Sequence, residues 1–314
     1  MKKTIVIGCI LIIIAATLWA VDGVVLRPGL YSLPVSLVVF VEHTLAFLFM
    51  APFLLKERAE LKKLRLADWS AFLWVAVFGG VLGTMFITKA LFFVQFVNLS
   101  VVVLIQKLQP VFALTLASLL LKERMPRKFF WWAVAAIIGT YFITFDSLVP
   151  NFNTGNQTAL AALYALGAAF AWGSSTVFSK RALAVVNYRI GTYLRFGLTA
   201  LIMFVIVLID GALFKFELIS PHQWLLFFII VFSSGGSAMF LYYYGLKWVR
   251  ASISSICELA FPLSAILLEF ILRHRGLGLT QWFGVLLLFI AIYNVSLIQQ
   301  RLSRPSAEAV ALPN

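Results

Sequence analysis

Ten stretches of this chain are long and apolar enough to cross a lipid bilayer as α-helices. A spanning helix needs about 20 mainly apolar residues, and its backbone polar groups must be hydrogen-bonded within the segment. The predicted spans are residues 4–26, 34–55, 68–89, 97–121, 128–147, 158–181, 188–210, 222–245, 251–272 and 280–299. The connections between them are short, so the sequence predicts an all-α integral membrane protein with ten transmembrane helices.

The composition excludes a soluble globular protein. Of the 314 residues, 62% are hydrophobic and 12% are charged, and the mean hydropathy is +1.00. A soluble domain carries about twice that share of charged residues. It also could not bury so much apolar surface, because its exterior must face water. The lipid bilayer is therefore the expected surrounding of the chain.

The net charge of +13 indicates membrane topology and not nucleic-acid binding. A nucleic-acid footprint gathers basic residues on one face of a domain, whereas here they lie at the ends of apolar segments. Alternate connections hold eighteen Lys and Arg residues, within 2–3, 56–65, 122–128, 180–189, 247–250 and 301–304. The other connections hold four, namely Arg27, Lys215, Arg273 and Arg275. Because basic residues stay cytoplasmic, we expect a multi-pass protein of the inner (plasma) membrane with both termini cytoplasmic and the 146–157 loop outside.

The two halves of the chain resemble each other. At a shift of 153 residues, LIIIAATLWAVDGVVLRPGL at 11–30 aligns with YALGAAFAWGSSTVFSKRAL at 164–183. At a shift of 152, Pro110 aligns with Pro262 and Gln106 with Glu258. We expect a first five-helix repeat in 1–150 and a second in 151–314, which ends in a short cytoplasmic tail. Five is odd, so the halves would be inverted, as in secondary transporters whose substrate site lies near the midplane.

Four tracts carry a family resemblance: LWAVDGVVLR, AWGSSTVFSKRAL, SVVVLIQKLQPVFALTLASLLLKE and SISSICELAFPLSAILLEF. Through them the chain resembles the drug/metabolite transporter (DMT) superfamily, in particular its EamA-type members. The resemblance implies a ten-helix transporter of small organic solutes, often amino acids or related metabolites, and often outward. Two positions depart from the pattern. The glutamate that usually ends the proline helix is Glu123 in the first half but is replaced by Arg275 in the second, and Asp22 stands where a small residue is more common.

Ionisable residues inside the spans are the first candidates for a site, because a charge at the bilayer centre costs about 2.5–3.5 kcal/mol on insertion scales. They are Asp22, Glu42, His43, Lys89, Lys107, Arg195, Glu258 and Glu269. Lys107 lies near the midplane of its span. Lys89 is near enough to a helix end to snorkel toward the headgroups, and Glu269 is expected at the interface.

The expected substrate-binding residues form a polar pocket with aromatic walls: Gln106, Lys107, Gln109, Glu258, Trp19, Trp172, Glu42 and Arg195. An anionic solute group would favour Lys107, and an ammonium would favour Glu258. Pro110 would free a backbone carbonyl near Gln106. The alternative is structural: Lys89, Lys107 and Arg195 would pair with Asp22, Glu42 and Glu258, in particular Glu42 with Lys89, and the tryptophans would serve ordinary packing.

Small residues cluster in corresponding spans of the two halves, at Gly79, Gly80, Gly83 and at residues 233–237. We interpret them as sites of close helix packing. Cys9 and Cys257 lie in apolar runs without metal-ligand spacing, and we interpret them as small buried hydrophobes. The sequence contains no nucleophile–base constellation, glycine-rich phosphate loop or metal cluster, so no catalytic residue, metal or cofactor is expected.

The sequence favours a secondary or facilitative transporter of a small organic solute, since its connections are too short for an ATPase domain. Export of an amino acid or metabolite by alternating access is the favoured function. Efflux of an organic cation or drug is the alternative within this class, and a membrane-embedded enzyme is the rival class. The candidates for proton coupling are Glu258, Asp22 and Glu42, each of which could equally be in a permanent pair. Neither the coupling ion nor the oligomeric state follows from the sequence.

Overall fold

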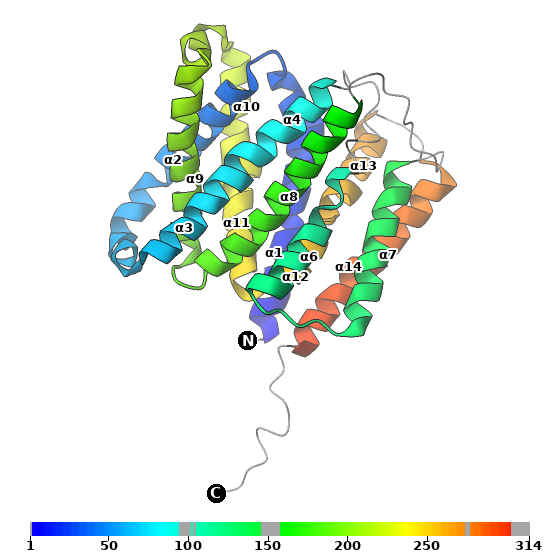
Figure 1. The fold of residues 1–314 in the computed structure, drawn as a ribbon. Coiled ribbons are helices and arrows are strands. Elements are labelled where there is room, and N and C mark those ends of the chain that lie inside the picture. The colour runs from blue at the N-terminus through cyan, green and yellow to red at the C-terminus, as the bar shows by residue number, and fades with distance from the viewer. Residues whose placement is uncertain (1, 94–101, 103–104, 146–157, 274–276, 303–314) are drawn as a thin grey trace, which may run out of the picture.

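The computed structural model describes residues 2–93, 102, 105–145, 158–273 and 277–302, and these form a helical bundle (Figure 1). The predicted loop 146–157 and the tail after 302 lie outside the described residues. In the N-terminal half, the helices are α1 (Lys2–Val21), α2 (Val35–Glu57), α3 (Leu66–Trp74), α4 (Gly83–Phe93), α6 (Gln109–Leu120) and α7 (Arg127–Thr144). In the C-terminal half they are α8 (Thr158–Ala182), α9 (Tyr188–Ile209), α10 (Pro221–Ile230), α11 (Gly236–Trp248), α12 (Ala251–Cys257), α13 (Ala260–Arg273) and α14 (Leu279–Leu302).

Several of these helices are continued by tighter or wider turns. The π-helical segment η1 (Asp22–Leu26) and the 3₁₀ segment η2 (Arg27–Leu30) extend α1. The π-helical segments η4 (Val75–Leu82) and η6 (Val231–Gly235) join α3 to α4 and α10 to α11. Two further 3₁₀ segments lie in connections, η3 (Arg58–Lys63) and η5 (Ala212–Leu218).

Eight segments of the described chain have the length and hydropathy of a membrane span. They are Lys3–Leu30, Val35–Pro52, Leu66–Ala90, Leu160–Ala182, Tyr188–Ile209, Pro221–Trp248, Ala251–Leu272 and Leu279–Leu302. These match eight of the predicted spans. The other two predictions, 97–121 and 128–147, correspond to the shorter apolar helix α6 with residues outside the described part, and to α7, which begins with two basic residues.

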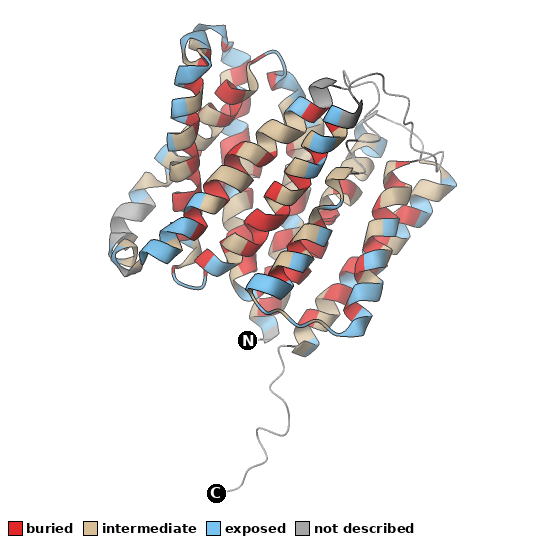
Figure 2. Ribbon diagram, viewed as in Figure 1, coloured by how far each residue is buried: buried red, intermediate tan, exposed pale blue. Residues whose placement is uncertain are grey.

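The surface of the bundle is apolar, as lipid requires. Ile209, Leu163 and Phe289 are 82%, 65% and 63% exposed, respectively. Figure 2 shows exposed residues along the outer faces of the helices and buried ones where helices meet. In water such a surface would drive aggregation, whereas against acyl chains it is stable. The all-α fold with multiple apolar spans is therefore as predicted.

The helices pack in a regular set of pairs. The first span α1 packs against α11 and α13, and α8 packs against α4 and α6. At one side of the bundle α2 lies beside α9, and at the other side α7 lies beside α14 (Figure 1). The N-terminus and the end of α14 lie at the same end of the bundle (Figure 1).

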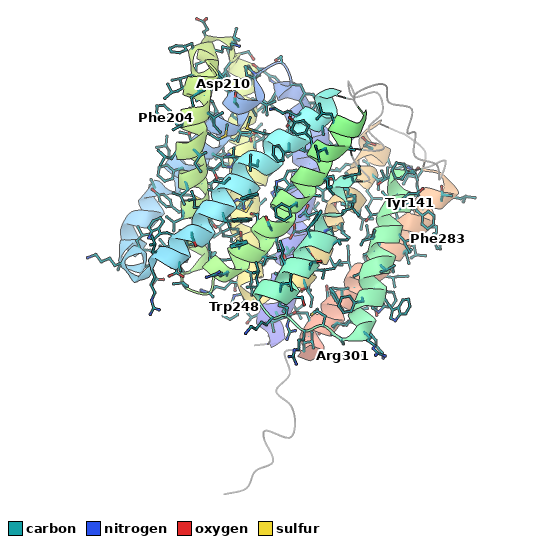
Figure 3. All side chains as sticks on the ribbon, in the orientation of Figure 1. Tyr141, Phe204, Asp210, Trp248, Phe283 and Arg301 are labelled. Atoms are coloured by element: carbon teal, nitrogen blue, oxygen red, sulfur yellow. The ribbon has the colours of Figure 1, made fainter. Side chains whose placement is uncertain are left out.

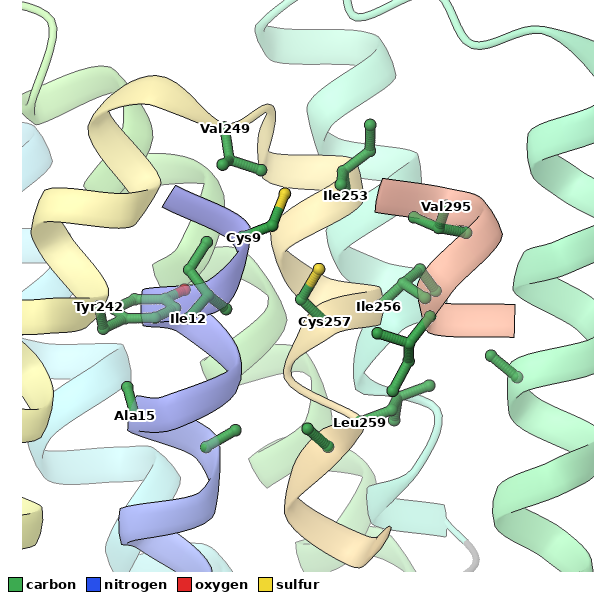
Figure 4. Close-up of a cluster of buried hydrophobic side chains, with 14 of the residues drawn as sticks. Cys9, Ile12, Ala15, Tyr242, Val249, Ile253, Ile256, Cys257, Leu259 and Val295 are labelled. Atoms are coloured by element: carbon green, nitrogen blue, oxygen red, sulfur yellow. The ribbon is translucent and has the colours of Figure 1, made fainter. Parts of the chain in front are cut away.

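The largest core cluster surrounds α1, where it meets α11, α12 and α14 (Figure 4). Cys9 and Cys257 are both buried, free thiols in this cluster, so their interpretation as small buried hydrophobes is confirmed. Close approach of α1 and α11 depends on glycine. A Cβ added at Gly8 would lie 2.9 Å from Val249 Cγ2 and 3.2 Å from the Gly245 carbonyl oxygen.

The glycines of η4 and at the start of α4 also serve close packing, as predicted. A Cβ added at Gly79 would collide with Ser175 and lie 3.1 Å from Arg195 Nη1. Added at Gly83, it would collide with the indole of Trp172. Because these positions have no side chain, α8 and α9 lie close to η4, which brings Trp172 and Arg195 into the centre of the bundle.

Candidate functional site

A cavity of about 520 Å³ lies among the helices of both halves. This volume is within the range of about 300–1,000 Å³ that small-molecule sites occupy. All eight residues predicted to bind substrate line it: Trp19, Glu42, Gln106, Lys107, Gln109, Trp172, Arg195 and Glu258. Asp22 and His43 line it as well, whereas Lys89 is exposed and is not part of the lining. The structure thus gathers the predicted residues around one space, and their binding of a solute remains a prediction.

Two interrupted helices form the centre of this cavity. In the second half, α12 ends at Cys257 and α13 begins at Ala260, so Glu258 lies in the break. Pro262 explains the break, because proline has no N–H and its ring clashes with the carbonyl four residues earlier, here that of Glu258. In the first half, Lys107 and Leu108 form a turn before α6, and Pro110 stands in the corresponding place. The structure therefore interrupts both helices, a larger effect than the freed carbonyl expected near Gln106.

Glu258 accepts hydrogen bonds from four neutral donors. The Gln109 amide donates to Oε2 at 3.0 Å. Oε1 accepts from the hydroxyls of Tyr242 at 2.8 Å, Ser254 at 3.2 Å and Thr176 at 3.5 Å. Within the described residues no cation lies within ion-pair distance of this carboxylate, so the predicted ion pair of Glu258 is not formed. Through this hydrogen bond, Gln109 connects the first half of the chain to the helix interruption in the second half.

The cavity lining also holds a cluster of three charged residues, Arg27, Asp22 and Glu42, whose pairing the sequence did not predict. Arg27 Nη2 lies 2.6 Å from Asp22 Oδ2 and 3.2 Å from Glu42 Oε1. The expected pairing of Glu42 with Lys89 is wrong, because Lys89 is exposed and its ammonium lies 5.7 Å from the Tyr164 ring centroid. The predicted first span ends at 26, which puts Arg27 in the connection that follows it. In the structure η1 and η2 continue that span to Leu30, so Arg27 lies inside it. The spacing of five residues between Asp22 and Arg27, closed by a π-helical turn, is the signal that could have revealed the pair.

Lys107 and Arg195 have no carboxylate within 4.0 Å among the described residues, so the predicted structural ion pairs do not form at these positions either. The Lys107 ammonium lies 4.8 Å from the Phe261 ring centroid, a cation–π contact. Arg195 is 9% exposed, and its Nη1 makes only long contacts, 3.4 Å to Ser175 Oγ and 3.5 Å to the Tyr243 hydroxyl. Two cations in the cavity lining are thus not neutralised by the protein side chains that surround them.

The aromatic residues of the cavity come from both halves. Trp19 lies on α1 and Trp172 at the matching position on α8, and both line the cavity. The Trp19 ring is 5.3 Å from that of Tyr242, with an interplanar angle of 57°. Sequence reasoning missed Tyr242 and Phe261 as lining residues; the run of three tyrosines at 242–244 inside an apolar span was the available signal.

The model of the EamA-like transporter family matches this chain twice, at residues 6–145 and 159–297. The chain belongs to the EamA-like transporter family. The resemblance noted in the sequence is therefore confirmed, and the chain is a small-molecule transporter of the membrane. Because the family is one of transporters, it does not support the rival reading of a membrane-embedded enzyme.

Similar proteins agree with this assignment. "Riboflavin transporter ImpX" of Fusobacterium nucleatum subsp. nucleatum (strain ATCC 23726 / VPI 4351) is 42% identical over 290 residues, which cover 92% of this chain and 97% of that protein. A crystal structure of another protein aligns with a TM-score of 0.73 and 18% identity, covering 95% of this chain and 99% of that chain. At that identity the match shows a shared fold.

Proposed function

We propose that this transporter carries riboflavin or a close flavin analogue across the membrane. The observation that carries the proposal is the 42% identity to a protein named as a riboflavin transporter, along 97% of its length. The cavity would therefore have to accommodate a flavin.

The chemistry of a flavin suits the lining of the cavity. Its fused three-ring system is flat and aromatic, and stacking on aromatic side chains contributes about 0.5–1.5 kcal/mol per pair beyond the burial of area. Trp19, Trp172 and Phe261 are aromatic residues of this lining. One edge of the ring system presents carbonyl oxygens and an N–H. A side-chain amide such as that of Gln106 can donate to the carbonyl oxygens through its NH₂ group and accept from the N–H through its own oxygen. The sugar-alcohol chain presents hydroxyls that match the remaining polar groups.

We also propose that the chain has ten spans in two inverted five-helix halves, residues 1–150 and 151–314. The family model starts at residue 6 and again at residue 159, which supports the shift of 153 found in the sequence. The helix contacts support it too: exchanging the halves converts the α1–α11 contact into α8–α4, and α1–α13 into α8–α6. Both halves carry a π-helical segment, η4 or η6, and an interrupted helix before a proline. Such paired interruptions are a feature of inverted-repeat transporters.

We propose that the chain works by alternating access, which this symmetry supports, and that the described arrangement is open away from the end where α1 begins. At that end, the Glu123 carboxylate accepts from the backbone N–H groups of Ala251 at 2.8 Å and Ser252 at 3.0 Å. The Lys180 ammonium donates to the carbonyls of Leu246 and Lys247 at 2.7 and 2.8 Å. The Glu123 contacts join the two halves at this end, and the Lys180 contacts connect α8 to α11 within the second half. Leu30 and Tyr31 line the cavity toward the other end. With the basic ends cytoplasmic, the cavity would face outward.

An amino acid or related zwitterionic metabolite is the second candidate for the solute. The observation that favours it is the presence of an unpaired cation, Lys107, and a carboxylate without a cation partner, Glu258, in one lining. An organic cation would use Glu258 alone. Export and import are both compatible with the alternating-access proposal.

Reconstitution in proteoliposomes tests these candidates together. Labelled riboflavin loaded on one side should appear on the other faster than in protein-free liposomes. Excess unlabelled riboflavin should slow the transport of the labelled riboflavin. Amino acids and tetraethylammonium should compete weakly. If amino acids compete and riboflavin does not, the second candidate replaces the first.

Proton coupling is tested in the same vesicles. Glu258, Asp22 and Glu42 are the proposed proton carriers, since Glu258 has only neutral partners and the outer cluster has two carboxylates for one guanidinium. If Glu258 carries the proton, Glu258→Gln should abolish gradient-driven accumulation while keeping solute exchange. Wild-type transport that is indifferent to a pH gradient and to a protonophore would exclude coupling to protons.

A further inference from the structure

Arg195 is a buried cation for which the protein supplies no counter-charge within the described residues. It lies on α9, is 9% exposed and lines the cavity. Its Nη1 is 3.4 Å from Ser175 Oγ and 3.5 Å from the Tyr243 hydroxyl, and its Nε has no hydrogen-bond partner. A guanidinium has five N–H donors and stays protonated in proteins. Most of its donor capacity is therefore unused in this state of the transporter.

Other arginines of the chain show what a structural arginine looks like in this fold. Arg27, in the same cavity, lies within ion-pair distance of both Asp22 and Glu42. Arg189, two turns earlier on α9, lies 2.7 Å from Glu57. Removing a charge from water costs several kcal/mol unless a partner compensates it. The contrast indicates that the partner of Arg195 arrives with the solute.

A second unused donor lies in the same lining. Ser234, in the π-helical segment η6, is 2% exposed and its hydroxyl has no hydrogen-bond partner in the described part of the chain. Buried hydroxyls are normally bonded, and an unpaired one needs an explanation. Arg195 and Ser234 come from neighbouring spans of the second half, and both can donate hydrogen bonds to a group in the cavity.

We propose that Arg195, assisted by Ser234, binds an acceptor-only oxygen group of the transported solute, an inference that rests on the proposed transport of a flavin. A planar guanidinium fork matches a pair of oxygen acceptors. On a flavin such acceptors occur in two places: a ring carbonyl oxygen with the unprotonated ring nitrogen beside it, and the phosphate of a phosphorylated side chain. Arg195 is thus a specificity-determining residue, which selects solutes that present this group.

Three ligands separate the two sources of the acceptor group. Riboflavin has the ring edge and the sugar-alcohol chain, lumiflavin has the same ring edge with a methyl group in place of that chain, and flavin mononucleotide adds the phosphate. Their binding to purified transporter in lipid nanodiscs can be followed by quenching of flavin fluorescence. The variants are Arg195→Gln, Arg195→Lys and Ser234→Ala, and Arg189→Gln on the same helix is the matched control.

We expect Arg195→Gln to weaken binding about 10- to 100-fold, the range for losing hydrogen bonds from a charged group. Arg195→Lys should lose less, because it keeps the charge but not the fork, and it tests the inference even if the glutamine variant does not fold. Ser234→Ala should lose a few-fold, and Arg189→Gln should bind as wild type. A loss shared by riboflavin and lumiflavin assigns the ring edge, and a loss confined to flavin mononucleotide assigns the phosphate.

Two outcomes overturn different statements. If wild type binds the flavins and both Arg195 variants bind all three equally well, the inference about Arg195 is wrong and the proposed function stands. If wild type binds none of the three, the flavin proposal itself fails, and with it this assignment. The unliganded variants should also melt close to wild type, because Arg195 lacks an ion pair to lose; a large fall in melting temperature with unchanged binding would make the residue structural.

Discussion

Gln109 Nε2 donates a hydrogen bond of 3.0 Å to Glu258 Oε2, and this bond links the interrupted helix of one half to that of the other. Gln109 is the first residue of α6, and Glu258 lies between α12 and α13. Each side chain stands a few residues before or beside a proline that prevents a continuous helix. The centre of the cavity is therefore a junction of the two halves, and the residues proposed to contact the solute there also make the contact between the halves.

Glu258→Ala should destabilise the protein, contrary to the expectation for a carboxylate that waits for a ligand. The substitution leaves donors on Gln109, Tyr242, Ser254 and Thr176 without their shared acceptor. Each hydrogen bond to a charged group contributes about 1.5–3 kcal/mol, so we expect a loss of at least about 2 kcal/mol in unfolding free energy. Thermal unfolding in detergent measures it, with Glu258→Gln as the conservative control. A Glu258→Ala protein as stable as wild type would contradict the prediction.

Lys107→Ala should behave in the opposite way. The Lys107 ammonium contacts the Phe261 ring at 4.8 Å and has no carboxylate within 4.0 Å in the described chain, so little protein–protein energy is lost. A cation–π contact contributes about 0.5–1 kcal/mol at exposed sites and about 2 kcal/mol when it is desolvated. We expect a change of no more than about 2 kcal/mol in stability and a clear loss of solute affinity, read by melting and by ligand titration. Aggregation, or a melting temperature far below wild type, would assign Lys107 a packing role.

The Arg27 cluster should show strong coupling in a double-mutant cycle. Arg27→Gln leaves Asp22 and Glu42 close together without their cation, and removing one partner of a buried pair typically costs about 3–5 kcal/mol. Arg27→Gln combined with Glu42→Gln should recover a large part of that loss, because one of the two uncompensated carboxylates is gone. Unfolding of the four proteins gives the coupling energy. Simple additivity of the two substitutions would show that Arg27 and Glu42 act independently.

Gly284→Ala should loosen the contact between α7 and α14. A Cβ at Gly284 would lie 2.7 Å from the Gly139 carbonyl oxygen and 2.8 Å from Ile143 N, both backbone atoms that cannot rotate away. Overpacking of this kind costs about 1–3 kcal/mol. Gly23→Ala is the matched control, because its Cβ would meet Phe261 at 3.7 Å, an ordinary contact. Equal melting temperatures of the two variants would show that α7 and α14 can separate without cost.

The topology can be tested with single cysteines, since both native cysteines are buried. Figure 3 places Asp210 at one end of the bundle and Trp248 and Arg301 at the other. Glu217 lies in η5, the segment that follows Asp210, and is exposed. Glu217→Cys should therefore react with a membrane-impermeant thiol reagent on intact cells. Arg124→Cys, in the connection before α7, should react only after permeabilisation. The reverse pattern would invert the orientation.

Much of the fold could be predicted because its determinants are local. A membrane span can be recognised by about 20 apolar residues in a row. Eight such segments lie where the hydropathy of the sequence predicts spans. The freed backbone carbonyl before Pro110 could be predicted, since the missing N–H is a property of the residue itself, whereas the full interruption of both helices was not predicted. The predicted set of cavity residues, from Trp19 to Glu258, also lines one space, because polar residues in an apolar span have few places to lie other than its interior.

The sequence by itself therefore determined the apolar spans, the resemblance between the two halves and most of the charged residues of the cavity lining. Only the tertiary structure decided which of those charges are paired. Arg27 reaches Asp22 and Glu42 because π-helical and 3₁₀ turns carry the first span beyond its expected end, while Lys89 faces outward. Arg195 and Lys107 lie in the cavity lining without carboxylate partners in the described chain. Pairing depends on how each helix is rotated and how closely glycines allow its neighbours to approach, and these quantities are set by contacts between segments far apart in the sequence.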